Sequence, residues 1–567
     1  MKITLQALAS AFLSVLTLPA VELPKDATPV LAAMQTELDR SLTVLKSQPT
    51  PPYFLSYEIT EMRGVSASGS FGTLVSSNDY CQRLLDIDLR VGDPALDNTH
   101  PLRSGVSSLS DRQYGAVGVP TEDTPEAIRA VLWYQTDRKY KAAVEQLTKV
   151  KTNVKVKVEE EDKSADFCAE PAAVFAAAPV KLSPDRKALE EKIRRYTAPF
   201  AKYGNIYHAN ASISLRVETR WYVNSEGSRI QVSEPSCQLA ISASTKADDG
   251  MEMPRHETFF AFRPEDLPSD AVVLQTVEKI IADLQALRTA PLVEPYTGPA
   301  ILSGRAAGVF FHEIFGHRAE GHRQKNVQEG QTFKKQLNQP ILPASFTVYS
   351  DPTLDRFGST ALSGHYQYDN QGTAARRVSL VEGGVLKGFM MARMPIEGFA
   401  QSNGHGRKQA GYAPVARQAN LMVEVAQPVT RAQLKQQLLA LVREQKKPYG
   451  LLFDDITGGF TITGRTIPNS FNVRPILVYR IYEDGREELV RGVDLIGTPL
   501  TTFSKIIAAS DDYDVFNGTC GAESGGVPVS AVAPGLLLSQ VEVQKKEKSQ
   551  NRKPLLPAPL EKPVPQS

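Results

Sequence analysis

Residues 311–317 read Phe-His-Glu-Ile-Phe-Gly-His, and this stretch decides how the rest of the chain is interpreted. The pattern His-Glu-x-x-x-His brings two imidazoles and one carboxylate together. Those are the groups that a catalytic zinc needs, because neutral nitrogens hold the metal and a carboxylate takes a proton from water. In the usual zinc-peptidase motif the histidines lie one residue closer and share a helix face. Here they lie about 140° apart around an ideal helix. A shared metal therefore requires a widened turn or an early helix end, which Gly316 would permit.

The segment before the motif predicts a buried helix. Ser303 is a suitable N-cap, and most of the residues that follow it are apolar. A helix that is apolar on nearly every side is buried. Because a His-Glu pair in such a helix needs a partner that offsets its desolvation, a bound metal is the favoured interpretation. The alternative is that His312 and His317 are core histidines with ordinary hydrogen-bond partners.

The composition is that of an ordinary globular protein large enough for two or more domains. The chain has 567 residues, of which 42% are hydrophobic and 22% charged. Its net charge of +1 gives no basic field that would favour nucleic acid or a membrane surface. The cysteines are Cys81, Cys168, Cys237 and Cys520. They form no CxxC pair, so neither a zinc ribbon nor a disulfide scaffold is indicated.

The two ends of the chain differ in composition from its middle. Residues 1–20 contain Lys2, a mostly apolar run and a small residue, Ala20, before Val21, which is typical of a secretory signal peptide. We therefore expect an exported protein, periplasmic or secreted; the alternative is a buried N-terminal helix in a cytoplasmic one. No later apolar run reaches the roughly 18 residues of a membrane span. Residues 546–567 are rich in Lys and Pro and are expected to be disordered.

Hydrophobic periodicity divides the remaining chain at the prolines near residue 291. In the N-terminal region, 21–290, helices are predicted at 30–46, 124–148, 183–202 and 270–289, and strands within 53–91 and 211–245. Residues 150–182 are charged and then Ala-rich, which predicts a surface insertion or linker. The C-terminal region, 291–545, is mainly strand-like, with helices expected at 430–446 and near 499–509.

Short motifs follow one another through the C-terminal half. They are Tyr296-Thr297-Gly298-Pro299, His312-Glu313-x-x-x-His317 with Glu320-Gly321, Asp369-Asn370-Gln371-Gly372-Thr373, Ser402-Asn403-Gly404 with Arg407, Arg417 with Asn420, Leu495-Ile496-Gly497, Gly518-Thr519-Cys520-Gly521 and Val527-Pro528-Val529. In this order they resemble the TldD/PmbA metallopeptidases, a family also labelled modulators of DNA gyrase. The resemblance covers residues 290–545 strongly and 30–290 in outline.

The resemblance implies an α+β fold, with an N-terminal α/β region followed by a largely β metallopeptidase domain that carries the HExxxH helix. It implies Zn²⁺ held by His312, His317 and Cys520, with Glu313 as the catalytic base on a zinc-bound water. PmbA-type members lack the metal motif, so this chain is similar to the TldD type. The family forms dimers that enclose the active site and admit peptides or unfolded polypeptide. A homodimer, or a heterodimer with a PmbA-like chain, is therefore expected.

Cys520 also suits the ligand role on chemical grounds. A thiolate is a strong zinc ligand, and the neighbouring glycines let the backbone approach a crowded site. The other three cysteines lie in the N-terminal half. The alternative is a buried structural cysteine in a tight turn. His322 is a rival ligand because it follows the motif closely in sequence.

Some further side chains near the motifs have open roles. Glu320 could accept a hydrogen bond from a ligand histidine, or it could be a surface carboxylate at the helix end. His365, Tyr366 and His405 could stabilise an oxyanion, although nothing in the sequence places them near the metal. Core or surface positions are the alternative for these three.

Two functions fit these patterns. The first is a zinc-dependent peptidase that hydrolyses peptides or unfolded segments. The second is a non-catalytic peptide-binding or assembly protein with a structural zinc. A structural zinc is usually closed by four protein ligands, whereas a catalytic zinc keeps an open position. A fourth protein ligand such as His322 would therefore favour the binding protein.

Overall fold

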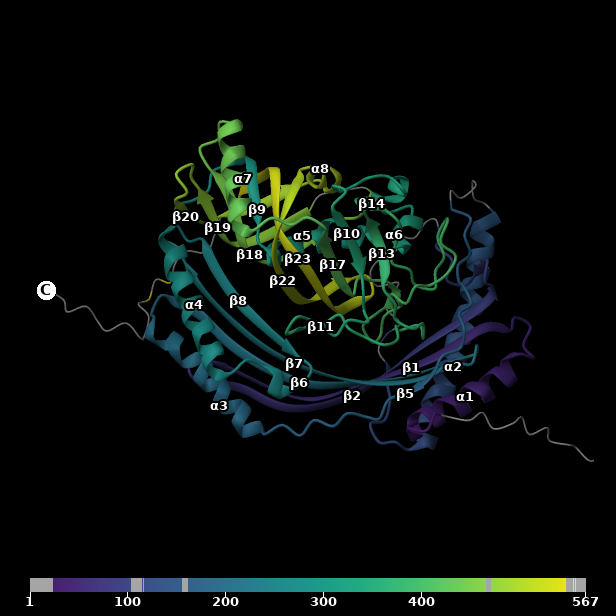
Figure 1. The fold of residues 1–567 in the computed structure, drawn as a ribbon. Helices are drawn as coiled ribbons and strands as arrows, with labels where there is room; N and C mark the ends of the chain where they lie inside the picture. The colour runs from purple at the N-terminus through teal and green to yellow at the C-terminus, as the bar shows by residue number, and fades with distance from the viewer. Residues whose placement is uncertain are drawn as a thin grey trace, which may run out of the picture.

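The computed structural model describes residues 24–102, 115, 117–155, 162–465, 471–546, 554 and 556. The proposed signal peptide, 1–20, lies outside these residues, as does nearly all of the C-terminal tail. The N-terminal region is a long curved sheet, and the C-terminal domain lies over the concave side of that sheet (Figure 1). No helix in the described part of the chain is both long and apolar enough to cross a membrane.

The N-terminal sheet is built from long antiparallel strands. They are β1 (Pro52–Ser70), β2 (Thr73–Asp93), β6 (Ile206–Asn224), β7 (Arg229–Lys246) and β8 (Glu252–Ala261), with the short strands β3 (Leu96–Asp97), β4 (Val117–Gly118) and β5 (Val174–Ala176). The order is β3-β2-β1-β6-β7-β5, with β8 beside β7 and β4 beside β2. Strands β6 and β7 form a hairpin whose turn falls within residues 224–229.

Helices cover the outer face of this sheet. They are α1 (Pro29–Leu45), α2 (Pro125–Lys155), α3 (Arg186–Thr197) and α4 (Asp270–Thr289), together with the 3₁₀ turn η2 (Ala198–Lys202). A second 3₁₀ turn, η3 (Pro264–Asp266), lines the concave side. Alternation along β6 explains the packing: Ile213 and Leu215 point into the apolar cluster with α3 and α4. The intervening Ser214 and Arg216 line the opposite, concave side.

The C-terminal domain is organised by an eleven-stranded sheet. Its strands are β9 (Tyr296–Leu302), β10 (Phe346–Ser350), β13 (Val378–Glu382), β14 (Val385–Leu386), β17 (Asn420–Val425), β18 (Gly450–Thr461), β19 (Phe471–Ile481), β20 (Glu487–Val490), β21 (Val493–Gly497), β22 (Ile506–Ala522) and β23 (Gly525–Lys545). Because β23 pairs with both β21 and β9, the path β23-β21-β19-β18-β9 closes on itself. Strand β22 forms a long hairpin with β23.

The remaining elements of this domain are short. They are α5 (Gly304–Ile314), η4 (Gly316–Ala319), α6 (His322–Lys325), η5 (Lys334–Gln336), α7 (Arg431–Glu444), α8 (Pro499–Phe503) and the two-stranded pairs β11 (Arg356–Phe357) with β12 (Thr360–Ala361) and β15 (Gly406–Arg407) with β16 (Val415–Ala416). Helix α5 lies within the main core, where Phe310, Phe311 and Ile314 are fully buried. The predicted α+β class is confirmed.

Part of the segment predicted to be a surface insertion, 150–182, is buried instead. Residues up to 155 continue helix α2, and β5 pairs with β7. Between them, Phe167 and Cys168 are buried, and Arg393 of the C-terminal domain donates to the Cys168 carbonyl oxygen. The buried part is thus the stretch around Phe167 and Cys168, which packs against Phe54 of β1 and Arg393 of the C-terminal domain, whereas 171–182 is exposed or half-buried.

Buried and half-buried ion pairs join the two regions. Lys408 of the C-terminal domain lies 2.7 Å from Glu58 and also pairs with Asp86 of the N-terminal sheet. Arg305, at the start of α5, lies 2.6 Å from Glu257 on β8. Residues of the curved sheet and of the C-terminal domain also line an open cavity of about 1340 Å³.

Candidate metal centre

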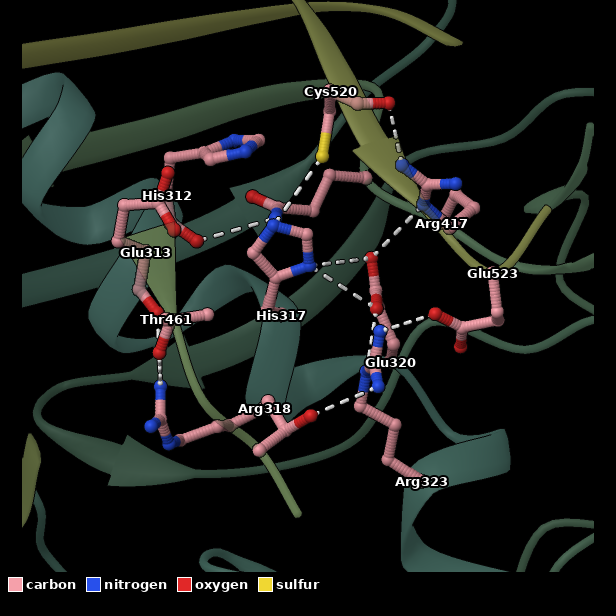
Figure 2. Close-up of polar contacts among 12 residues, drawn as sticks. His312, Glu313, His317, Arg318, Glu320, Arg323, Arg417, Thr461, Cys520 and Glu523 are labelled. Carbon is pink, nitrogen blue, oxygen red and sulfur yellow. Dashed lines mark hydrogen bonds and ion pairs between the residues drawn. The ribbon is translucent and has the colours of Figure 1, made fainter. Parts of the chain in front are cut away.

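His312, His317 and Cys520 come together in the core of the C-terminal domain. One ligand atom from each of the three lies within 4.8 Å of the other two. The Cys520 sulfur is 3.3 Å from Nε2 of His317, and the two imidazole rings are 4.9 Å apart (Figure 2). All three side chains are buried. The structure therefore brings together the three residues predicted to hold zinc, although Cys520 lies 203 residues after His317.

The helix ends where the five-residue spacing requires it to end. Ser303 caps α5 by accepting from the Ala306 N–H, and the α-helix stops at Ile314. A 3₁₀ turn, η4, then carries His317. Gly316 does not adopt the left-handed backbone conformation. It is required instead by close approach, because a Cβ there would lie 1.8 Å from Oε1 of Gln418.

An arginine satisfies the carbonyl groups that this early end exposes. Arg318 donates to the carbonyl oxygens of Glu313, at 2.9 Å, and Ile314. It also donates to the Thr461 hydroxyl at the end of β18 (Figure 2). Burial and the nearby Arg323 lower the pKa of Arg318 to about 10, yet it remains charged at neutral pH. The guanidinium thus stabilises the end of the motif helix and ties it to β18.

Glu320 orients His317. Its carboxylate is fully buried and lies 3.3 Å from Nδ1 of His317, while Nε2 of the same ring faces Cys520. Burial opposes ionisation of Glu320, but His317 and Arg323 outweigh it and lower its pKa to about 2. Of the two roles that the sequence left open, the structure therefore supports a hydrogen-bond acceptor of a ligand histidine over a surface carboxylate.

The electrostatics of the cluster favour a thiolate. Burial opposes ionisation of Cys520, but the charges of His317, His312 and Arg417 lower the pKa of its thiol well below the ordinary range. Burial likewise disfavours the His317 imidazolium, yet Cys520 and Glu320 raise the pKa of His317 well above its ordinary value. A thiolate beside two imidazoles is a donor set that zinc prefers.

The remaining donor atoms of the cluster also fit a metal. Nδ1 of His312 is buried and has no hydrogen-bond partner among the described residues. A buried ring nitrogen without a partner is costly in an ordinary core, and coordination would satisfy it. His312, His317 and Cys520 therefore fit the zinc ion predicted from the sequence.

Glu313 follows His312 on the last turn of α5 and is 7% exposed. Its side chain packs against the backbone of Gly459 on β18, where an added Cβ would lie 2.3 Å from Cγ of Glu313. Gly459 thus leaves space for the carboxylate next to the cluster. The sequence gives no signal for this contact, because the two residues lie on separate elements.

The other predicted site residues lie elsewhere. His322 pairs with Glu523 and is not among the three clustered ligands. Nδ1 of His365 lies 2.9 Å from the Pro352 carbonyl oxygen, and the Tyr366 hydroxyl donates to that of Gly404. His405 is fully buried and its Nε2 lies 2.9 Å from the Ser350 hydroxyl. The contacts of His365, Tyr366 and His405 with these groups support structural roles rather than the oxyanion role.

A second group of ligand-type side chains is an ion-pair network. Glu320, His322 and Glu523 also lie within 4.8 Å of one another. Arg323 lies 2.8 Å from both carboxylates, and Arg417 lies 3.4 Å from Glu320. Since these guanidinium groups already supply the positive charge, the group does not require a metal.

The fold and the buried His-His-Cys cluster define the class of protein. It is an α+β protein with a candidate metal centre at the end of a core helix. Residues 295–545 match the PmbA/TldA metallopeptidase C-terminal domain. This match, together with the similarity to TldD homologues, supports membership of the TldD/PmbA family, as the sequence motifs predict.

Several curated relatives are similar to the chain over part of its length. A metalloprotease from Methanothermobacter thermautotrophicus is 26% identical over 55% of this chain and 64% of its own. A metalloprotease from Archaeoglobus fulgidus is 29% identical over 42% of this chain and 51% of its own. A zinc metalloprotease TldD homolog from Saccharolobus solfataricus is 24% identical over 64% of this chain and 78% of its own. The chain thus spans less than two thirds of the length of the first two of these relatives.

Solved structures share the fold along nearly the whole chain. TldE from Thermococcus kodakarensis has a TM-score of 0.59 at 14% identity, covering 90% of this chain and all of its own. A proposed modulator of DNA gyrase from Thermotoga maritima has a TM-score of 0.57 at 16% identity, covering 90% of this chain and 99% of its own. These likenesses establish the fold.

Proposed function

We propose that the chain is a zinc metallopeptidase that hydrolyses peptides or unfolded polypeptide segments. The observation that carries the proposal is the convergence of His312, His317 and Cys520 beside Glu313, at the end of a helix that stops between the two histidines. The relatives named metalloproteases, including one named a zinc metalloprotease, support it.

The metal would be held by the two imidazoles and the Cys520 thiolate. When bound, zinc would act as a Lewis acid that lowers the pKa of water to about 7. Glu320 holds Nδ1 of His317 so that Nε2 faces the cluster. The Glu313 carboxylate accepts a proton from the attacking water and passes it to the leaving amine as the peptide bond breaks.

The ligand count favours the peptidase over a binding protein with a structural zinc. Among the described residues, the cluster around Cys520 contains three ligand groups. His322, the fourth candidate in the sequence, is bonded to Glu523. Three protein ligands leave a position for water, as catalytic zinc sites do.

The burial of the site supports an extended substrate. His312, Glu313, His317 and Cys520 are each between 5% and 7% exposed. A folded protein surface cannot bring its backbone to groups that are this deep, whereas a peptide or an unfolded segment can. A homodimer, or a heterodimer with a PmbA-like chain, and export from the cytoplasm remain parts of this proposal.

The test is the variant Glu313→Gln. It removes the base but leaves the proposed ligands. We therefore expect normal zinc content, while the rate of hydrolysis of an unstructured peptide falls about 10²- to 10⁴-fold. Glu382→Gln is the control, because Glu382 is exposed at the end of β13 in the same domain. Wild-type hydrolysis by purified Glu313→Gln with full zinc would refute the proposed mechanism.

A further inference from the structure

Two consecutive residues touch all three segments that carry the proposed ligands. Arg417 and Gln418 lie between β16 and β17, and both side chains are fully buried. In sequence they are about a hundred residues from both the HExxxH motif and Cys520. Neither side chain faces solvent, so each must find its partners inside the domain.

Arg417 fixes the hairpin that carries Cys520. Its Nη2 donates to the Cys520 carbonyl oxygen at 2.7 Å (Figure 2). Its Nη1 donates to the Ser524 hydroxyl at 2.7 Å and to the Gly525 carbonyl oxygen at 3.0 Å. These acceptors lie on both sides of the turn between β22 and β23. One planar guanidinium therefore sets the conformation of the turn that follows the cysteine.

The same guanidinium reaches the residue that orients His317. Nε of Arg417 lies 3.4 Å from Oε1 of Glu320, and Glu320 lies 3.3 Å from Nδ1 of His317 (Figure 2). Arg417 thus links the backbone of one proposed ligand to the carboxylate that holds another. Arg323 strengthens this link, because it lies 2.8 Å from both Glu320 and Glu523.

Gln418 reaches the third proposed ligand. Its Nε2 donates to the His312 carbonyl oxygen at 3.2 Å. Its Oε1 lies where a side chain at residue 316 would be. Arg407 holds Gln418 in turn by donating to its carbonyl oxygen at 2.5 Å. The amide therefore occupies the space at the end of α5 where the helix stops.

We propose that Arg417 and Gln418 are positioning residues that assemble the metal centre. Arg417 holds Cys520 against His317, and Gln418 holds the end of the helix at His312. The two histidines share one continuous segment, whereas Cys520 arrives on a separate hairpin. Loss of Arg417 should therefore release the sulfur ligand first and leave the imidazoles in place. This inference rests on the ligand set of the proposed function.

The experiment compares two arginine-to-lysine variants of the full-length chain, loaded with Co²⁺ in place of zinc. A thiolate bound to Co²⁺ gives a charge-transfer absorption band that nitrogen ligands do not give. Arg417→Lys keeps the charge, but an ammonium cannot reach the Cys520 carbonyl, Ser524 and Glu320 together. We expect the sulfur band to be largely lost and Co²⁺ affinity to fall about 10- to 100-fold.

Arg393→Lys is the matched control. Arg393 is also fully buried, also donates to a cysteine carbonyl oxygen, that of Cys168, and also pairs with a glutamate, Glu226. Its loss should lower thermal stability by a similar amount while the sulfur band and the Co²⁺ affinity stay at wild-type values. Wild-type metal binding by Arg417→Lys, or an equal loss in Arg393→Lys, would overturn the inference.

Ser524→Ala keeps the test decisive if Arg417→Lys does not fold. It removes one acceptor of Arg417 at the turn and should weaken the sulfur band in a folded protein; an unchanged band would count against the inference. The wild-type spectrum separates the two proposals. A wild-type Co²⁺ protein without a sulfur band would refute Cys520 as a ligand, and the role of Arg417 with it. A band unaffected by these variants would refute the positioning role alone.

Discussion

Gly459→Ala should disable the proposed base without removing the proposed metal. The new Cβ would lie 2.3 Å from Cγ of Glu313, 2.8 Å from Cδ and 2.9 Å from Oε1. Ordinary contact between carbon atoms begins at about 3.5 Å, so the Glu313 side chain must move by about 1 Å. Gly459 is not in the left-handed backbone region, and alanine therefore fits the backbone itself.

A displacement of this size should lower activity far more than stability. A misplacement of about 1 Å costs up to about 10²-fold in rate, or ~2.7 kcal/mol of activation free energy. The Glu313 side chain can rotate away from the new methyl group, so the fold need not break. We expect kcat for an unstructured peptide to fall about 100-fold. Zinc content should stay at the wild-type value because Glu313 is not a proposed ligand.

Gly464→Ala is the control, because its added Cβ would meet a single atom, the Gln328 carbonyl oxygen, at 3.9 Å. It should keep both activity and zinc. The reasoning fails if Gly459→Ala retains wild-type kcat, since Glu313 would then work equally well from another position. It also fails if Gly459→Ala loses zinc, since the space would then protect the ligands rather than the base.

Two further predictions concern the cluster and the core around it. Cys520→Ser should lower zinc content and abolish peptide hydrolysis while circular dichroism shows a folded chain; wild-type zinc affinity and activity would exclude Cys520 as a ligand. Burial lowers the pKa of His405 from 6.5 to about 3. Below pH 6.5 the unfolded state therefore binds a proton that the folded state does not bind, and the free energy of unfolding decreases as the pH falls. From about pH 7 to about pH 5 this should cost about 2 kcal/mol in urea unfolding, and His405→Gln should remove that part of the pH dependence; an unchanged pH dependence would contradict it.

The sequence predicts the parts of the fold that depend on local pattern. The apolar run after Ser303 predicts α5, and the Ser303 cap is present. The spacing of His312 and His317 requires a helix end, and the helix does end at Ile314. These features follow from neighbouring residues, so a single sequence contains the information for them.

Contacts between distant segments could not be predicted in this way. The partners of Arg417 and Gln418 come from segments about a hundred residues away on either side. Only the fold places them together. The same reason explains the region near residue 506, where a helix was expected to reach 509. Helix α8 ends at Phe503, and the following residues join β22 because they pair with β23. Pairing with a distant strand overrode the local preference.

The five-residue spacing of the histidines and the burial of Arg318 belong to one structural solution. A helix that stops at Ile314 leaves carbonyl oxygens without helical partners in a dry core, which is costly. Arg318 supplies donors to Glu313 and Ile314 from the 3₁₀ turn that also carries His317. The negative end of the α5 dipole in turn favours the positive charge of Arg318. Among the described residues, no carboxylate lies within ion-pair distance of Arg318. The wider spacing is therefore compatible with a closed helix end, because the turn that brings His317 to the proposed metal site also supplies the donor for the last carbonyl groups.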